Sequence, residues 1–205
     1  MSTTRVWTIP NLISLLRLAC VPVFLWLLWA RDEPIAAAAL LAVLGATDWV
    51  DGYIARHFDQ GSELGKVLDP TADRVMLVAA AVALLVEDLP FAVDLVIWIV
   101  LLREVVIATA TVALAIAGAR RIEVVWAGKA GTLAIMFALP LFLWADSIDS
   151  DAWSAFVWFA GWCFAISGIA LGYYAAAKYV PAARAALREG RATRVAGETN
   201  AEVHS

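Results

Sequence analysis

Residues 34–56 read PIAAAALLAVLGATDWVDGYIAR, an apolar run whose end carries charged side chains. A helix that crosses the hydrocarbon core of a bilayer needs ~20 mostly apolar residues, and this stretch is long enough. Five further apolar stretches of comparable length lie at residues 11–30, 67–86, 91–118, 124–145 and 152–179. The sequence therefore predicts an all-α integral membrane protein with six transmembrane helices.

The composition of the 205-residue chain agrees with this fold class. Apolar residues make up 63% of the chain and charged residues 17%, against ~45–50% and ~25% in soluble domains. A soluble monomer of this size could not bury so much apolar surface, so that class is excluded. The net charge of −4 gives no electrostatic reason to bind nucleic acid, and we expect no such partner.

Basic residues collect in alternate connecting segments. One set of segments contains Arg5, residues 57–66, Arg120, Arg121 and a tail with Lys178, Arg184, Arg188, Arg191 and Arg194. The other set contains Arg31 as its one basic residue, together with acidic residues at 32–33, 87–88 and 146–151. By the positive-inside rule the first set is cytoplasmic, and so are both termini. We expect a membrane domain over residues 1–180 and a polar, largely disordered cytoplasmic tail over residues 181–205.

Two pairs of aspartates stand where membrane helices rarely carry charge. Asp48 and Asp51 are three residues apart, and Asp69 and Asp73 are four apart, so each pair shares one face of a helix. The segment between the pairs belongs to the cytoplasmic set. Both pairs should therefore lie at a similar depth, just inside the cytoplasmic boundary, which places the active site on that side.

Four carboxylates at one depth repel one another, and each buried charge costs at least ~2.5–3.5 kcal/mol on insertion scales. Hard divalent cations with oxygen ligands would neutralise them, and four aspartates can hold two such ions. The alternative is that these aspartates cap helices or pair with Arg56, Lys66 and Arg74. Gly52, next to the second aspartate, leaves room for a phosphate-bearing group.

These residues form a longer pattern with fixed gaps. It reads Asp48-x2-Asp51-Gly52-x2-Ala55-Arg56-x8-Gly65-x3-Asp69-x3-Asp73. At every fixed position it resembles the signature of the CDP-alcohol phosphatidyltransferases. The resemblance implies transfer of a phosphatidyl group from CDP-diacylglycerol, a membrane lipid, to an alcohol acceptor, with release of CMP. It also implies a homodimer in the bacterial plasma membrane.

The same resemblance implies roles for single residues. Two Mg²⁺ or Mn²⁺ ions would be held by Asp48, Asp51, Asp69 and Asp73, and Asp73 would also be the catalytic base. The CDP part of the donor would be bound by Asn11, Gly52, Arg56 and Ser62. Asn11, which follows Pro10, is also a plausible helix N-cap.

Arg103 and Lys129 are the candidates for binding the acceptor. Each interrupts an apolar stretch, in the cytoplasmic half or the middle of the expected bilayer. A guanidinium suits bidentate contact with a phosphate, so the two could hold an acceptor that carries one. The alternative is an Arg103–Glu104 ion pair and a Lys129 that snorkels to the interface.

The acceptor itself is either phosphatidylglycerol or glycerol 3-phosphate. Leu102-Arg103-Glu104 and Gly128-Lys129-x2-Thr132 look like phosphatidylglycerophosphate synthases, which use glycerol 3-phosphate. Those enzymes usually carry a second Lys and a Gln where this chain has Gly131 and Ile135. One fewer cation suits the monoanionic diester phosphatidylglycerol, the acceptor of the CDP-dependent cardiolipin synthases, and we favour that acceptor.

Two other classes of protein remain as alternatives. Carboxylates inside a membrane often mark an ion pathway, so a divalent-cation transporter would also contain them. The chain lacks the inverted repeat of many transporters, and its aspartates gather on one side of the membrane. A purely structural membrane protein would have to tolerate the cost of all four charges.

Overall fold

The computed structural model describes the backbone of residues 9–58, 65–116 and 126–203, and the side chains of residues 12–47, 71–110, 112 and 126–178. The described backbone is helical apart from short turns. Its elements are α1 (Ile9–Leu25), the π-helical segment η1 (Trp26–Ala30), α2 (Pro34–Phe58), α3 (Gly65–Leu84), α4 (Phe91–Ile116), α5 (Trp126–Asp146) and α6 (Asp151–Val203).

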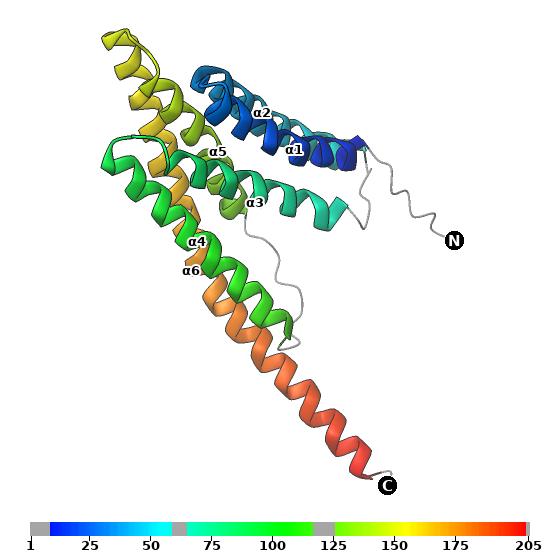
Figure 1. Ribbon diagram of the computed structural model, residues 1–205. Coiled ribbons are helices and arrows are strands. Elements are labelled where there is room, and N and C mark those ends of the chain that lie inside the picture. The colour runs from blue at the N-terminus through cyan, green and yellow to red at the C-terminus, as the bar shows by residue number, and fades with distance from the viewer. Residues whose placement is uncertain (1–8, 59–64, 117–125, 204–205) are drawn as a thin grey trace.

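The six helices form one bundle (Figure 1). The three tight turns that join α1 to α2, α3 to α4 and α5 to α6 lie at one end of it. Helix α5 makes its most extensive contacts with α6 and packs next on α2, while α1 packs on α3. The turn between η1 and α2 contains Asp32, a non-glycine residue with a positive φ of 54°, a conformation that aspartate tolerates better than most residues.

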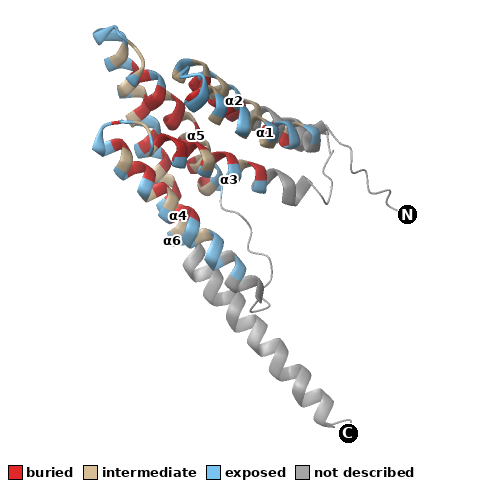
Figure 2. Cartoon of the chain, viewed as in Figure 1, coloured by how far each residue is buried: buried red, intermediate tan, exposed pale blue. Residues whose placement is uncertain are grey.

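The buried core and the apolar exterior are both extensive. The core includes Phe24 of α1, Met76 of α3, Ile97 of α4 and Phe142 of α5, none more than 1% exposed (Figure 2). Large apolar side chains also cover the outside, for example Trp98 at 61% and Phe159 at 68% exposure. A contiguous apolar exterior of this kind is suited to contact with lipid rather than water.

Three helical segments within the described residues are long and apolar enough to cross a membrane. They are Leu12–Ala30, Trp126–Asp146 and Asp151–Lys178. The all-α fold class is confirmed, and each of the six expected stretches corresponds to one helix. That all six cross the bilayer stays a prediction. The expected boundary at residue 180 falls inside α6, and the division into a domain and a tail also stays a prediction.

Helices α5 and α6 approach each other closely through glycines. A β-carbon added to Gly131 of α5 would lie 2.9 Å from both the carbonyl oxygen of Gly168 and the amide nitrogen of Gly172. One added to Gly168 would lie 2.8 Å from the Ile135 side chain. The two backbones therefore touch along this line, which we call the glycine seam (Gly131, Gly168 and Gly172).

Candidate active site

The four aspartates lie near the ends of two consecutive helices, on either side of the segment that joins them. Asp48 and Asp51 belong to the C-terminal part of α2, and Asp69 and Asp73 belong to the N-terminal part of α3. The helical spacing that places each pair on one face is therefore present in the backbone. The side chains of Asp48, Asp51 and Asp69 lie outside the described residues, whereas that of Asp73 is described.

Asp73 is held by an arginine from another helix. Nη1 of Arg17, on α1, donates a hydrogen bond to Oδ1 of Asp73 and forms an ion pair with it. Arg17 is only 2% exposed, and Ser14, one turn earlier on α1, is equally buried. A buried guanidinium requires a counter-charge, so this face of α1 is directed at the carboxylate that the sequence marks as the base.

The side chains predicted to bind the CDP part all lie outside the described residues. Asn11 belongs to α1, and Gly52 and Arg56 belong to α2, but their side chains lie outside the described residues. Ser62 lies outside them altogether. The nucleotide site therefore stays a prediction.

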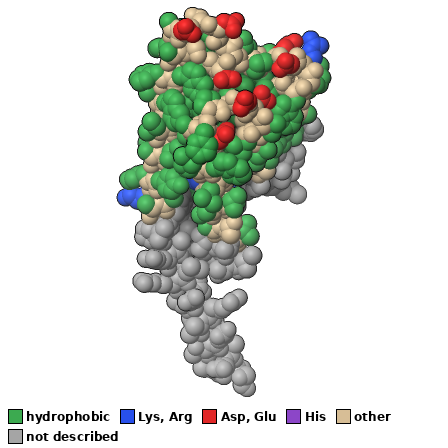
Figure 3. Space-filling model, turned by 60° about the vertical axis from the view of Figure 1, so that its left-hand side comes forward, with side chains coloured by type: hydrophobic (Ala, Val, Ile, Leu, Met, Phe, Trp, Pro, Cys, Tyr) green, Lys and Arg blue, Asp and Glu red, His purple; other side chains and the backbone are tan. Residues whose placement is uncertain are grey.

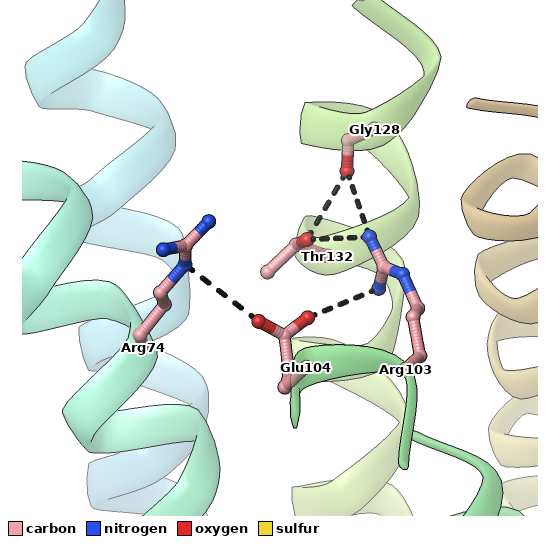
Figure 4. A network of polar contacts seen from close by, with 5 residues as sticks. All are labelled: Arg74, Arg103, Glu104, Gly128 and Thr132. Atoms are coloured by element: carbon pink, nitrogen blue, oxygen red, sulfur yellow. Dashed lines mark hydrogen bonds and ion pairs between the residues drawn. The ribbon is translucent and has the colours of Figure 1, made fainter. Parts of the chain in front are cut away.

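A second polar centre surrounds Arg103 of α4 (Figure 4). Arg103 is 8% exposed, and its Nη2 donates to Oγ1 of Thr132 at 3.2 Å and to the carbonyl oxygen of Gly128 at 3.5 Å, both on α5. The Thr132 hydroxyl in turn donates to the Gly128 carbonyl at 3.1 Å. Nε and Nη1 of Arg103 are buried and make no hydrogen bond among the described residues.

Glu104 joins this centre to the helix of the aspartates. Its Oε1 lies 3.5 Å from Nη1 of Arg103, and its Oε2 lies 3.7 Å from Nε of Arg74 on α3. Arg74 directly follows Asp73, so the two polar centres meet at adjacent residues of α3. The sequence suggested the Arg103–Glu104 pair, which the structure contains, but it gave no sign of the link to Arg74.

No hydrogen bond joins Lys129 to Arg103 among the described residues. The Lys129 side chain is exposed. Gly128, the residue before it, packs on α6, because a β-carbon added there would lie 3.4 Å from the β-carbon of Ala175. The polar contacts of Arg103 among the described residues are with Gly128, Thr132 and Glu104. A joint role of Lys129 and Arg103 stays a prediction.

Comparison with known proteins identifies the family. The CDP-alcohol phosphatidyltransferase family matches residues 7–173 of this chain. The chain belongs to this family. It is 39% identical over 193 residues, 91% of this chain and 87% of the relative, to the cardiolipin synthase (CMP-forming) of Streptomyces coelicolor. It is also 34% identical over 185 residues, 88% of this chain and 97% of the relative, to the CDP-diacylglycerol–glycerol-3-phosphate 3-phosphatidyltransferase of Escherichia coli K12.

As a member of this family, the protein is a transferase of phospholipid biosynthesis that uses CDP-diacylglycerol. An alcohol is implied as its second substrate. Ion transport, the rival class, gains no support from either relative.

Members of the family are generally metal-dependent. Within the described part of the chain, no group of three or more His, Cys, Asp and Glu side chains is placed to bind a metal ion. The side chains of Asp48, Asp51 and Asp69 lie outside that part. The donor set nevertheless fits hard divalent cations, because all its members are carboxylates, and the described one, Asp73, is a half-buried carboxylate with 23% side-chain exposure.

Proposed function

We propose that this enzyme transfers the phosphatidyl group of CDP-diacylglycerol to phosphatidylglycerol, forming cardiolipin and CMP. The observation that carries the choice of acceptor is the glycine seam. At position 131, where glycerol 3-phosphate enzymes usually carry a second lysine, a β-carbon would already lie 2.9 Å from the α6 backbone. Ile135, at the position of their glutamine, is fully buried in the core.

The charges around Arg103 support the same acceptor. Arg74 and Arg103 each contribute a positive charge, and Glu104, which lies 3.7 Å from Arg74 and 3.5 Å from Arg103, contributes a negative charge. The cluster therefore carries a net charge of about +1. With Lys129 the site still has one cation fewer than glycerol 3-phosphate enzymes, which usually carry a second lysine, and fewer positive charges suit the monoanionic diester of phosphatidylglycerol better than the near-dianionic monoester of glycerol 3-phosphate. We assign Arg103 and Lys129 to the phosphate of that acceptor.

In the proposed reaction Asp73 takes the proton of the acceptor hydroxyl. The acceptor oxygen then forms a bond to the phosphatidyl phosphorus, while the bond from this phosphorus to the CMP oxygen breaks and CMP leaves. Arg17 would orient the Asp73 carboxylate through its bond to Oδ1. Asp48, Asp51, Asp69 and Asp73 would hold two Mg²⁺ or Mn²⁺ ions, and the positive charge of these ions would stabilise the phosphate oxygens. Asn11, Gly52, Arg56 and Ser62 would bind the CDP part.

We further propose that all six helices span the bacterial plasma membrane, with the site on the cytoplasmic side and both termini in the cytoplasm. The distribution of charge supports this orientation. Acidic side chains gather toward the end that carries the three tight turns, and apolar side chains cover the flank (Figure 3). The predicted site lies away from these turns, at the other ends of α2 and α3. A homodimer is the expected assembly.

The acceptor is tested by supplying both candidates to the same preparation. Purified protein with Mn²⁺ and CDP-diacylglycerol should release CMP when phosphatidylglycerol is added, and mass spectrometry should detect cardiolipin. Glycerol 3-phosphate should support a much lower rate. Faster CMP release with glycerol 3-phosphate would assign the chain to phosphatidylglycerophosphate synthesis, the alternative that the Escherichia coli relative favours.

A further inference from the structure

The guanidinium of Arg103 packs directly against a glycine of α6. A β-carbon added to Gly172 would lie 2.8 Å from Nε of Arg103, 3.0 Å from Cζ and 3.3 Å from Cδ. Nonbonded heavy atoms of this kind prefer a separation of about 3.5–4.0 Å. The guanidinium therefore occupies the space that any side chain at position 172 would need.

The other side of the guanidinium is fixed by α5. Nη2 of Arg103 donates to Thr132 at 3.2 Å, and Nη1 lies 3.5 Å from Glu104 of its own helix. Arg103 thus lies in a slot between α5 and α6, and it is 8% exposed there. A group that fills the slot from the α6 side would push the guanidinium away from Thr132.

We propose that Gly172 is a positioning residue of the acceptor site, which sets the location of the Arg103 guanidinium by leaving this slot open. The inference rests on the proposed function, because it needs Arg103 to bind the phosphate of the acceptor. Arg103 suits that role because its guanidinium carries a positive charge, and its buried Nε and Nη1 make no hydrogen bond among the described residues. Gly172 acts through Arg103 and need not touch either substrate.

Gly168 provides a matched control on the same helix, one turn earlier. Its added β-carbon would lie 2.8 Å from Cδ1 of Ile135 and 2.9 Å from the carbonyl oxygen of Gly131. Gly168→Ala therefore strains the same contact between α5 and α6 without entering the slot of Arg103. A general weakening of the glycine seam should appear in both variants, whereas displacement of Arg103 should appear only in Gly172→Ala.

The experiment measures KM for phosphatidylglycerol, KM for CDP-diacylglycerol, kcat and the melting temperature of the purified full-length protein. We expect Gly172→Ala to raise the acceptor KM about tenfold, the effect of losing one hydrogen bond to a charged group, with the donor KM unchanged. Gly168→Ala should lower the melting temperature and leave both KM values unchanged.

A double-variant cycle tests whether Gly172 acts through Arg103. In the Arg103→Ala background, Gly172→Ala should cause no additional rise in the acceptor KM, because effects that share one contact are not additive. Arg103→Ala itself leaves Glu104 a partner in Arg74, at 3.7 Å. Independent, multiplying effects of the two substitutions would overturn the proposal, and so would an unchanged acceptor KM in folded Gly172→Ala protein.

Loss of folding in Gly172→Ala would also be informative. If the double variant with Arg103→Ala folds, the guanidinium is what the added methyl group displaces, and the proposal stands. If the double variant also fails to fold, the methyl group meets something else and the proposal is overturned. An unchanged acceptor KM in Arg103→Ala would overturn both this inference and the assigned role of Arg103. If Arg103→Ala raises the acceptor KM but folded Gly172→Ala protein does not, only the inference about Gly172 is overturned, and the role of Arg103 stands.

Discussion

Arg17 of α1 donates a hydrogen bond to Oδ1 of Asp73 of α3, and the two side chains form an ion pair across 56 positions of sequence. Arg17 is 2% exposed, so the pair lies inside the contact between α1 and α3. The residue proposed as the base is thus oriented by a helix that carries none of the four aspartates. The contact packs α1 on α3 and, in the proposed mechanism, also orients the base.

Removal of Arg17 should damage both stability and activity. Truncating one partner of a buried ion pair costs ~3–5 kcal/mol because it leaves the other charge uncompensated. Arg17→Ala should therefore lower the melting temperature in detergent and abolish most CMP release, and Arg17→Lys should restore stability better than activity. Arg31→Ala is the control, because the exposed Arg31–Glu33 pair at 3.3 Å is of a class worth ~0–1 kcal/mol. Equal melting temperatures and rates for Arg17→Ala and the native protein would contradict this role.

The helices of this protein were predictable from the sequence because apolar length alone defines them. Each of the six stretches corresponds to one helix, and the turn at Arg31-Asp32-Glu33 falls where charge interrupts the apolar run. The aspartate pairs were also predictable, since helical spacing within one segment determines which residues share a face.

Contacts between helices were not predictable in the same way. Periodicity fixes the face of a single helix, but the rotation of one helix against another depends on packing along its whole length. Arg17 with Asp73 and Arg74 with Glu104 each join two helices, and no spacing rule relates their positions. The contact of Arg103 with Gly172 likewise joins two helices, and only the structure places them together.

The four carboxylates should be indispensable for transfer. Asp48→Ala, Asp51→Ala and Asp69→Ala should each abolish CMP release, and EDTA should do the same to the native enzyme until Mn²⁺ is restored. Expression and membrane insertion should survive, because removing an intramembrane charge lowers the cost of insertion. Asp149→Ala, on the exposed turn before α6, should retain full activity. Substantial CMP release by Asp51→Ala protein would exclude the two-metal site.

The orientation in the membrane can be tested by labelling single cysteines. In a variant that lacks Cys20 and Cys163, the two free cysteines, a probe at Ser62 should react from the cytoplasmic face and one at Ser150 from the opposite face. Permeabilised cells should label both positions equally, which controls for access. Labelling of both sites from one side of intact cells would overturn the arrangement of six spans.

Thr132 should contribute to acceptor binding through Arg103. Thr132→Val preserves shape but removes the oxygen that accepts from Nη2 of Arg103 at 3.2 Å. Loss of this bond should raise the acceptor KM by about tenfold while the donor KM stays constant. Thr109→Val is the matched control, because the exposed Thr109 hydroxyl donates only to the Val105 carbonyl of its own helix among its described contacts. If the acceptor KM of Thr132→Val equals that of Thr109→Val, Thr132 has no role in acceptor binding.

Lys129 offers the most direct test of the acceptor site, because its exposed side chain can be removed without leaving a buried charge uncompensated. If Lys129 binds the acceptor's phosphate, Lys129→Ala should lose a charged hydrogen bond worth ~1.5–3 kcal/mol, so the acceptor KM should rise roughly ten- to a hundredfold. The donor KM and the melting temperature should change little.

Lys178→Ala serves as the control for Lys129→Ala. It removes an exposed lysine that lies over the ring of Tyr174 at 5.6 Å, on a different helix, and should leave both KM values unchanged. Lys129→Arg should retain most of the affinity for the acceptor, because it keeps the charge. If Lys129→Ala raises only the KM for CDP-diacylglycerol, Lys129 belongs to the nucleotide side of the site. The assignment of the basic pair Arg103 and Lys129 to the acceptor's phosphate would then be wrong.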